Sequence, residues 1–519
     1  MVGIRKVLFV FSFIITQILI QNRISFAANA RFGVSPDNNQ ELLLSVLKNA
    51  KHSLIINIYE FVHPAIADQV IKKIQQGVCT DFLIEGDPVG GITPESVAIL
   101  EKIVAVAQLN THSDHKEISS EALTGKRKRD ESGDLNCHHL YILPPQKMLL
   151  PGTKRRFKFN HAKYVVADHK EVLISSENFS INGHPNPGLK GTRGWDIAIE
   201  DTELAEKLTS VFEEDSDLKN SDVRVLDLAW ISKIKEKWVK PTVGPLEVST
   251  ESATPEGETP RCEAKASPAV SSSEPTRKTA ARPIGTGTVN EPWVILSPNA
   301  APALRGVISM ATQTLDLNFM SLPKTTPILD AIIDAARGGV SVRLLLNDSA
   351  LFAQAGKGRP AAPKSTVSQP TSNEPVPTDA PQKKPSQPRV DAQVEMAKFV
   401  LRLATCDQIP IDARIINARP IEITYIHNKG MILDGDKVLV SSINGTANSM
   451  ENNREVAVFV QSSDAAQYYG AFFESDWNNS PMMDISDELA KNPCRRELII
   501  PSASGPLGFF PGASFGGGT

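Results

Sequence analysis

The sequence has little cysteine, and no two of its cysteines are close together. Five cysteines are scattered over 519 residues without a C-x-x-C pair. Zinc ribbons and disulfide-rich scaffolds need closely spaced cysteines, so the spacing excludes both classes and predicts at most one disulfide. We expect no metal site in this chain.

Long hydrophobic runs are absent after residue 20. The run from Val7 to Ile20 is shorter than the roughly 20 residues that a transmembrane helix needs. Because a basic pair precedes this run and small residues follow it, we expect residues 1–30 to be a cleaved signal peptide. The protein would then be secreted or periplasmic.

The chain also lacks an excess of positive charge. A formal net charge of −4 argues against a globally basic nucleic-acid binder. Basic side chains do gather locally, in Lys126–Arg129 and in Lys154–Lys158. We expect these loops to contact an anionic membrane surface, and the second loop to attract a phosphate-bearing substrate.

Two stretches are poor in large apolar residues and rich in Pro, Ser and Thr, a composition typical of disorder. The first, 243–289, reads as a linker, and the second, about 354–388, as an insertion within a lobe. A chain of 519 residues exceeds what one core usually holds. We therefore predict two lobes, at 31–242 and 290–485, followed by a tail at 486–519.

The most informative feature of the chain is an octet that occurs twice. His161–Asp168 reads H-A-K-Y-V-V-A-D and His427–Asp434 reads H-N-K-G-M-I-L-D, and each is followed, after six residues, by Ser-Ser-x-Asn. The repeat continues outside the octets, since Phe212–Asp215 matches Phe473–Asp476. Strand, helix and strand patterns succeed one another in both halves, which predicts an α/β fold.

Alternating apolar residues predict a β-strand in each octet, so that its His and Lys share one face. A turn and a returning strand then bring the Ser and Asn beside them. Each half thus offers a base, a cation and two neutral hydrogen-bonding groups. These are His161, Lys163, Ser176 and Asn178 in the first half, and His427, Lys429, Ser442 and Asn444 in the second.

These motifs resemble the signature of the phospholipase D superfamily, H-x-K-x-x-x-x-D followed by G-S-x-N, usually present twice. Ser175 and Ser441 stand where that family usually has Gly. The resemblance implies two homologous lobes, each a mixed, mainly parallel β-sheet flanked by helices. A pseudo-twofold axis would relate the lobes and place the active site at their interface.

The resemblance also implies roles for the side chains. His161 would attack phosphorus to give a covalent phosphohistidine, while His427 would protonate the leaving alcohol and then activate water or another alcohol. The two lysines would neutralise the phosphate oxygens, and the Ser and Asn side chains would complete the cradle. Asp168 and Asp434 belong to the catalytic motif, although an Asp at a strand end is often a turn residue.

A downstream acidic residue in each half is expected to orient a catalytic imidazole. The segment G-W-D-I-A-I from Gly194 aligns with N-R-E-V-A-V from Asn453. Through the resemblance, this alignment gives the orienting role to Asp196 and Glu455.

The resulting hypothesis is a monomeric phospholipase D-type phosphodiesterase that hydrolyses or transfers phosphatidyl groups without a metal or other cofactor. An endonuclease that cuts DNA or RNA, or a cardiolipin synthase-like phosphatidyltransferase, would use the same chemistry. A non-catalytic phosphate- or lipid-binding protein is a further alternative. The presence of both histidines and both lysines disfavours it.

Overall fold

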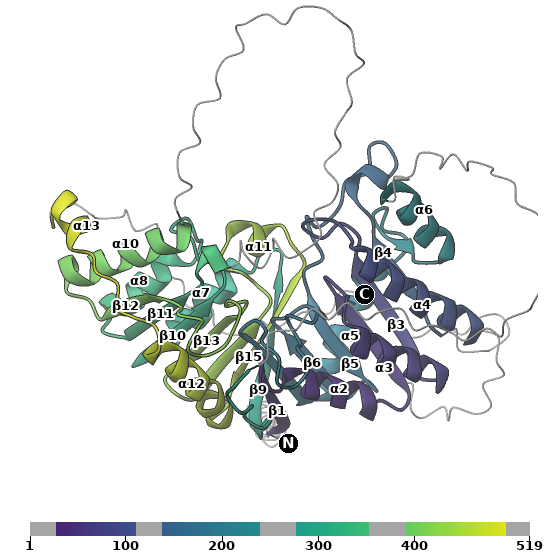
Figure 1. Cartoon of the computed structure of the whole chain (residues 1–519), viewed down its shortest axis with the longest axis horizontal. Helices are drawn as coiled ribbons and strands as arrows, with labels where there is room; N and C mark the ends of the chain where they lie inside the picture. Colours follow the sequence, from purple (N-terminus) through teal and green to yellow (C-terminus); the bar gives the residue numbers. More distant parts are fainter. Residues whose placement is uncertain (1–26, 111–136, 239–276, 352–390, 495–519) are drawn as a thin grey trace, which may run out of the picture.

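Both halves of the chain contribute to one large β-sheet in the computed structural model, which describes residues 27–110, 137–238, 277–351 and 391–494 (Figure 1). Most of the predicted signal peptide, linker and insertion lie outside the described residues, as do the basic segment Lys126–Arg129 and the end of the tail. In the parts that are described, no helix has the length and apolar character needed to cross a bilayer.

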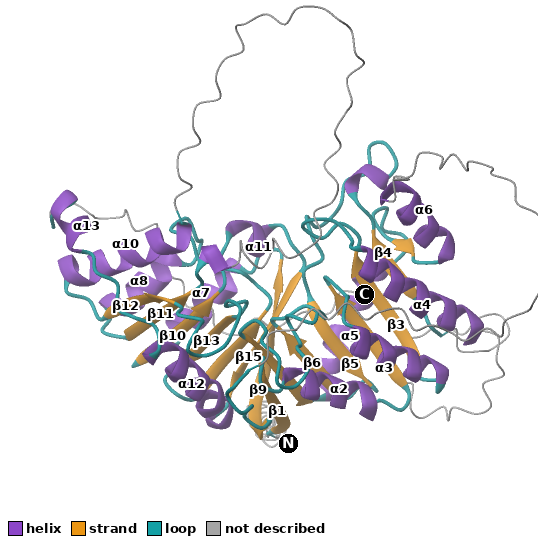
Figure 2. Ribbon diagram, in the orientation of Figure 1, coloured by secondary structure: helices purple, strands orange, loops and turns teal. Residues whose placement is uncertain are grey.

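The sheet has 15 strands in an order that is nearly palindromic (Figure 2). From the centre outward, the first half runs β1, β7, β6, β5, β2, β3, β4 and β8, and the second runs β9, β15, β14, β13, β10, β11 and β12. β1 and β9 pair antiparallel at the centre, where Ala30 lies opposite Gly287. The duplication in the sequence is therefore a duplication of the fold.

The first half contains eight strands and five α-helices with one 3-10 helix among the described residues. The strands are β1 (Ala28–Ser35), β2 (Ser53–Ile58), β3 (Cys79–Glu85), β4 (Leu140–Leu143), β5 (Lys163–Ala167), β6 (Glu171–Ser175), β7 (Gly194–Glu200) and β8 (Arg224–Val225). The helices are α2 (Asn39–Asn49), α3 (Pro64–Gln75), α4 (Pro94–Asn110), η2 (Gln146–Met148), α5 (Thr202–Ser216) and α6 (Leu228–Trp238).

The described part of the second half repeats this order without an equivalent of β8. The strands are β9 (Gly285–Ser297), β10 (Thr314–Phe319), β11 (Ser341–Leu346), β12 (Ile411–Ile415), β13 (Lys429–Leu433), β14 (Lys437–Ser441) and β15 (Glu455–Gln461). The helices are α7 (Ala301–Ser309), α8 (Leu329–Arg337), α10 (Ala392–Asp407), α11 (Ala447–Glu451), α12 (Ser463–Asn478) and α13 (Ser486–Lys491).

The prediction of two homologous lobes with a mixed sheet and flanking helices is confirmed, but the sheet is not mainly parallel. In each half only two strand pairings are parallel, β2 with β3 and β3 with β4, and likewise β10 with β11 and β11 with β12. Helical crossovers join these strands, and a crossover produces a parallel pair. The strands that carry the duplicated octets are joined by tight turns to their neighbours, and these pairings are antiparallel.

Three apolar cores hold the helices on the sheet. One face of the first half is covered by α2, α3, α4 and α6, and the equivalent face of the second by α7, α8 and α10. The core under α5 and α12 contains residues of both halves, among them Phe212, Trp195 and Phe473. Because this apolar surface is buried between the lobes, it stabilises their arrangement around the central seam.

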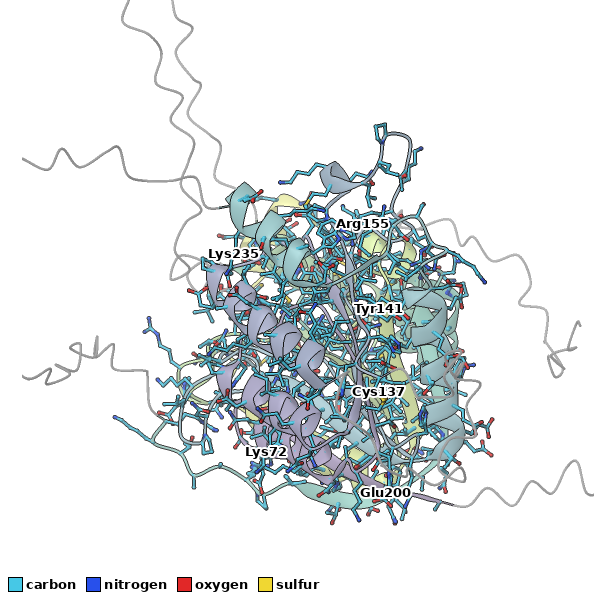
Figure 3. All side chains as sticks on the ribbon, turned by 90° about the vertical axis from the view of Figure 1, so that its right-hand side faces the viewer. Lys72, Cys137, Tyr141, Arg155, Glu200 and Lys235 are labelled. Atoms are coloured by element: carbon cyan, nitrogen blue, oxygen red, sulfur yellow. A yellow bond between two sulfur atoms is a disulfide. The ribbon has the colours of Figure 1, made fainter. Side chains whose placement is uncertain are left out.

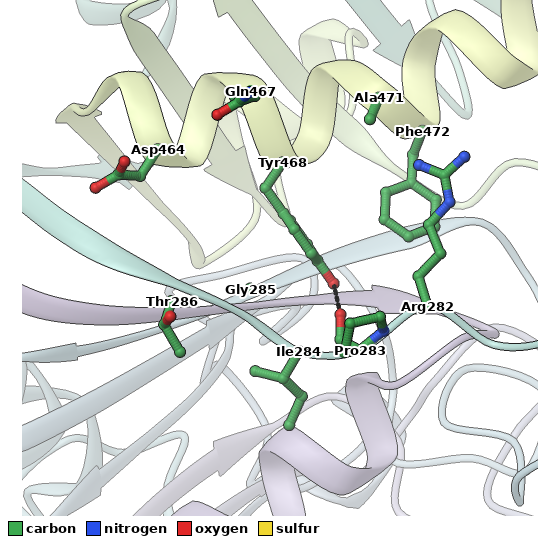
Figure 4. A pocket seen from close by; sticks show the side chains of 10 residues that line it. All are labelled: Arg282, Pro283, Ile284, Gly285, Thr286, Asp464, Gln467, Tyr468, Ala471 and Phe472. Atoms are coloured by element: carbon green, nitrogen blue, oxygen red, sulfur yellow. Dashed lines mark hydrogen bonds between the residues drawn. The ribbon is translucent and has the colours of Figure 1, made fainter.

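The predicted linker extends too far toward the C-terminus, since β9 begins at Gly285. The segment before it lies along α12, where the Tyr468 hydroxyl donates to the Pro283 carbonyl oxygen at 3.1 Å and the Arg282 guanidinium lies 4.6 Å from the centre of the Phe472 ring (Figure 4). No His or Lys lines the hollow between this segment and α12. It is therefore separate from the catalytic motifs.

Two disulfides are present, where the spacing of the cysteines predicted at most one. Cys79 pairs with Cys137, and Cys406 pairs with Cys494. The partners are separated by 58 and 88 residues, and the pairing depends on how the helices and strands pack. The second bridge attaches the segment after α13, within the predicted tail, to the end of α10.

Candidate active site

Both duplicated motifs lie where the two lobes meet. His161 and Lys163 stand at the start of β5, and His427 and Lys429 at the start of β13. The backbone N–H of each histidine donates to a carbonyl oxygen of the other lobe, His161 to Arg454 at 2.7 Å and His427 to Arg193 at 2.8 Å. The motifs therefore contribute to one junction, as predicted.

Each imidazole is held by a carboxylate from the opposite lobe. His161 Nδ1 lies 2.6 Å from Glu455 Oε2, and His427 Nδ1 lies 2.9 Å from Glu177 Oε2. Both carboxylates are buried. Glu455 accepts from His161 Nδ1 and so favours the tautomer whose Nε2 lone pair is available for chemistry. Glu177 lies at ion-pair distance from His427 Nδ1, which has no hydrogen-bond partner in the described structure.

The sequence predicted Glu455 correctly as an orienting residue but was wrong about Asp196. Asp196 Oδ2 lies 2.9 Å from Nε2 of the buried His184, and its Oδ1 accepts from the Ser175 hydroxyl at 2.6 Å. Neither contact involves His161 or His427. The orienting carboxylate of the first half is Glu177, the variable residue of the Ser-Ser-x-Asn motif.

The error arose from an alignment that was shifted by two residues. In the sheet, Ser35 pairs with Gly194 and the equivalent Ser297 pairs with Glu455. Gly194 is therefore the counterpart of Glu455, and Asp196 is the counterpart of Ala457. A shift of two residues keeps side chains on the same face of a strand, so alternation of apolar residues could not reveal it.

Glu177 fills the space that the missing side chain of Gly194 leaves. A Cβ atom placed on Gly194 would lie 1.9 Å from Glu177 Oε1. The carboxylate thus reaches the position of the Glu455 carboxylate from a loop instead of a strand. The sequence did contain a signal, because aligning Arg193 with Arg454 places Gly194 at the position of Glu455.

These two arginines form reciprocal clamps between the lobes. Arg193 binds Asp476 through Nε at 2.7 Å and Nη2 at 2.9 Å, and Arg454 binds Asp215 through Nη2 at 2.8 Å. Both aspartates end the matching segments Phe212–Asp215 and Phe473–Asp476. Charge pairs that are this well buried position the backbone on which the neighbouring orienting residues depend.

The two motif lysines are fully buried beside their histidines. Lys163 Nζ donates to the His161 carbonyl oxygen at 2.8 Å, and Lys429 Nζ donates to the His427 carbonyl oxygen. Burial lowers the pKa of Lys163 well below its usual range and that of Lys429 to about 8. A phosphate anion would raise the pKa of both amines and so favour their charged form.

Charged groups of each half affect the imidazole of the other half. Burial lowers the pKa of His161 to about 4, and Lys429 of the other lobe contributes to the lowering. Burial also lowers the pKa of His427, with Lys163 of the other lobe among the causes. Both imidazoles therefore favour their neutral form until an anion enters the site.

The side chains of three of the four predicted cradle residues bind protein groups. The Ser176 hydroxyl oxygen accepts from the backbone N–H of Trp195 at 2.9 Å, and the Ser442 hydroxyl donates to Glu455 at 2.8 Å. Asn178 Nδ2 donates to Glu60 at 3.2 Å. The side-chain oxygens of Asn178 and Asn444 are buried without a protein partner in the described structure, so the asparagines retain unused hydrogen-bonding capacity.

Asp168 and Asp434 lie outside the site, at the far ends of β5 and β13. Asp168 accepts from the N–H groups of Lys51, His52 and Ser53 at 2.7–3.1 Å. Asp434 accepts in the same way from residues 312–314, and these bonds, working against burial, lower its pKa to about 2. These bonds fix the turn before the neighbouring strand, and none of them involves a motif histidine or lysine, so the structure does not bring Asp168 and Asp434 into the predicted site.

Tyr59 is a site residue that the sequence reasoning missed. Its ring centre lies 4.6 Å from that of His161 and 5.0 Å from Lys163 Nζ. The residue follows β2 directly, and a single aromatic after a strand carries no distinctive pattern. It forms an aromatic wall for the first-half imidazole.

The basic segment before His161 is partly neutralised. Arg155 forms two hydrogen bonds with Glu85, at 2.8 and 2.5 Å, and Arg156 binds Asp222 at 2.8 Å. Within this segment, Lys154 and Lys158 are exposed. In the described parts of the chain, no group of three or more His, Cys, Asp or Glu side chains is arranged to hold a metal ion.

Comparison with known proteins identifies the family. The family described as "Cardiolipin synthase, PLD-like domain" matches residues 43–216 and, a second time, residues 304–477. The chain belongs to the phospholipase D superfamily. Its chemistry is accordingly the phosphodiester chemistry of that superfamily, and no curated protein matches the sequence.

Several solved structures are similar to this phospholipase D superfamily member at low sequence identity. Phosphatidylserine synthase from Haemophilus influenzae is 13% identical over 88% of this chain and 87% of its own, with a TM-score of 0.49. Nuc from Salmonella typhimurium, titled a phospholipase D family member, is 17% identical over 38% of this chain and 96% of its own, with a TM-score of 0.27. Polyphosphate kinase from Porphyromonas gingivalis is 10% identical over 86% of this chain and 50% of its own, with a TM-score of 0.40.

Proposed function

We propose that this protein is an exported phospholipase D-type phosphodiesterase that cleaves phospholipids through a covalent phosphohistidine. The observation that carries the proposal is the reciprocal arrangement of His161 and His427, each held by a carboxylate of the opposite lobe. Two buried lysines beside them supply positive charge for a phosphate without a metal ion. Both halves of the site come from one chain, which supports a monomeric enzyme.

The two carboxylates differ in a way that supports a different role for each histidine. Besides His161, Glu455 accepts hydrogen bonds from Ser442, Ser449 and Asn453. Three neutral donors spread its charge and weaken its hold on an imidazolium. Glu177 Oε1 is buried without a hydrogen-bond partner in the described structure, so its charge remains to favour a protonated His427, whose Nδ1 lies 2.9 Å from Oε2.

In the proposed reaction, His161 is accordingly the nucleophile and His427 the acid. His161 Nε2 attacks phosphorus, the bond from phosphorus to the leaving oxygen breaks, and His427 gives its proton to that oxygen. His427, now neutral, takes a proton from water, whose oxygen attacks phosphorus and breaks the bond to His161. An alcohol in place of water would give phosphatidyl transfer by the same steps.

Substrate assays separate this proposal from the alternatives. The purified protein is incubated in EDTA with phosphatidylcholine vesicles, with the same vesicles plus glycerol, and with plasmid and single-stranded DNA. Release of choline supports the phospholipase, and phosphatidylglycerol formed at the expense of phosphatidic acid supports a phosphatidyltransferase. Cleavage of DNA alone would contradict the lipid substrate while leaving the chemistry intact.

Export is part of the proposal, and the two disulfides support it. The chain contains the disulfides Cys79–Cys137 and Cys406–Cys494. Disulfides are stable in an oxidising compartment and are rare in the cytosol. Expression with residues 1–30 fused to a reporter, followed by N-terminal sequencing of the released protein, tests the predicted signal peptide. Retention of the fusion inside the cell would contradict it.

A further inference from the structure

Two loops border the active site at one edge of the sheet. They follow β3 and β4, which run parallel with Glu85 opposite Leu143, so both loops leave the sheet at the same edge. The parallel neighbour β2 ends at this edge too, and Tyr59 follows it against the His161 ring. The loops after β3 and β4 therefore lie at the mouth of the site.

Each loop exposes a large apolar side chain. Val89, in the first loop, is 70% exposed, and Leu150, in the second, is 69% exposed. The Val89 N–H donates to the Tyr59 hydroxyl oxygen at 2.6 Å, which ties the first loop to the aromatic wall of the site. Apolar side chains that protrude beside a functional site are typical of an interaction surface.

Hydrogen bonds within the second loop hold the conformation in which Leu150 is exposed. Gln146 closes its base, because its Nε2 donates to the Thr153 carbonyl oxygen at 2.7 Å and its Oε1 accepts from the Arg155 N–H at 3.1 Å. The Arg155 side chain is fixed by Glu85. Figure 3 shows Arg155 near one end of the molecule, with the chain around it projecting from the body, and Lys72 and Glu200 toward the other end.

The charges around the Leu150 tip are positive. Residues 144–167 contain no Asp or Glu, while Lys154 and Lys158 are exposed. The arginines between these lysines bind carboxylates of the protein, so the lysines supply the outward charge. An apolar tip with ammonium groups behind it matches a phospholipid surface, where acyl chains lie beneath a layer of phosphates.

We propose that the tips at Val89 and Leu150 insert into the interface of a phospholipid bilayer while Lys154 and Lys158 bind headgroup phosphates. This inference rests on the proposed function, because it explains how a lipid phosphodiester reaches His161 from the membrane. A nucleic acid would contact the lysines, but it would leave the apolar tips in water. The bilayer uses both features of the surface.

The test compares Leu150→Asp and the double variant Val89→Asp/Leu150→Asp with Met310→Asp. Met310 is a matched control, since it is apolar, 46% exposed and precedes β10 at the opposite edge of the sheet. Binding to vesicles of phosphatidylcholine, with and without phosphatidylglycerol, is measured by co-sedimentation. We expect a loss of about tenfold for Leu150→Asp, a larger loss for the double variant and no change for Met310→Asp.

Turnover distinguishes docking from catalysis. Hydrolysis of vesicle lipid should fall with binding, whereas turnover of a soluble short-chain phosphatidylcholine below its micelle concentration should stay the same. Lys154→Glu/Lys158→Glu should remove the extra affinity that phosphatidylglycerol provides. Unchanged vesicle binding by the double variant would overturn the proposal, as would DNA binding that depends on the loops while vesicles are ignored.

The outcome for docking can be separated from that for the proposed function. If the unaltered protein cleaves neither soluble nor vesicle phospholipid, the proposed function fails. Loop-dependent vesicle binding in that case would still support docking. If the soluble lipid is cleaved and the double variant binds vesicles normally, docking fails and the proposed function stands.

Discussion

The two halves of this molecule place equivalent carboxylates beside equivalent imidazoles by different routes. In the second half the carboxylate belongs to Glu455, the first residue of β15. In the first half the same strand position is Gly194, and Glu177 reaches into the vacant space from the loop after β6. The comparison teaches that duplication has preserved the position of a charge and not the residue that carries it.

The difference has a chemical consequence. Glu455 lies within a group of neutral donors, whereas half of the Glu177 carboxylate has no hydrogen-bond partner in the described structure. We therefore expect the two equivalent histidines to differ as acids and bases. An enzyme with a nucleophile and a general acid needs this inequality, because one imidazole must be neutral when the other is protonated.

The largest expected effect comes from removing the two histidines in turn. His161→Ala should lower kcat by a factor on the order of 10⁵ for every substrate, because the nucleophile is lost. His427→Ala should cost on the order of 10²–10⁴ with a phospholipid and much less in the first step with a p-nitrophenyl ester, whose leaving group needs no proton. Rapid-quench measurement of p-nitrophenol release checks this.

The same variants locate the covalent intermediate. His427→Ala lacks the base that activates water, so a phosphoryl adduct should accumulate on His161 and be visible in the intact mass and in the peptide containing His161. An adduct on His427 in the His161→Ala protein would reverse the assignment. Circular dichroism of both variants controls for misfolding.

Moving the first-half carboxylate from residue 177 to residue 194 tests the equivalence of the two halves most directly. Glu177→Ile, which copies Ile443 of the second half, should lower kcat about 100-fold because His427 loses its orienting group. Gly194→Glu alone should misplace both carboxylates, since its Cβ would lie 1.9 Å from Glu177 Oε1. The combined variant should recover a large part of the activity, as measured by steady-state kinetics. If it is no better than Glu177→Ile, Gly194 and Glu455 are not equivalent.

A smaller effect is expected in the pH profile, from Lys429. Burial lowers its pKa to about 8, so the ammonium loses its proton as the pH rises through this value. The value of kcat/KM should therefore fall on the alkaline side near pH 8, where the positive charge for phosphate is lost. In Lys429→Arg the guanidinium stays protonated, and the alkaline limb should move to higher pH even if the maximum rate drops about tenfold. An unmoved limb would assign it to another group.

The smallest effect on activity is expected from Asp434. Asp434→Ala removes several backbone hydrogen bonds at the far end of β13, and we expect the free energy of unfolding to fall by about 3 kcal/mol. Its folded pKa of about 2 lies below the usual 3.8, so its contribution is present above pH 4 and is lost as the pH falls toward 2. Urea unfolding measures the first effect.

Asp168→Ala is the matched variant in the first half. Both aspartate variants should retain kcat within about threefold at temperatures where they are folded, because neither carboxylate touches the site. A loss of kcat comparable with that of the histidine variants would return these residues to the catalytic set.

The sequence was sufficient for the features that depend on local pattern and repetition. Two octets at equal distances from Ser-Ser-x-Asn predicted the duplicated lobes and the strand on which His161 and Lys163 share a face. It failed where the answer depends on contacts between distant segments. The pairing of Cys406 with Cys494 and the contacts of Asp196 with His184 belong to this class.

By itself, then, the amino-acid sequence determined which chemical groups the protein possesses and along which strands they alternate, because side-chain type and strand period are local properties. Tertiary structure alone decided that Glu177, and not Asp196, holds His427, since that choice depends on an empty glycine position in a neighbouring strand. It also decided that Asp168 and Asp434 stand at the far end of their strands. The spacing of residues along the sequence does not record how far a side chain reaches or which strand positions pair. Those two properties distinguish the residues at the site from residues that only share its motif.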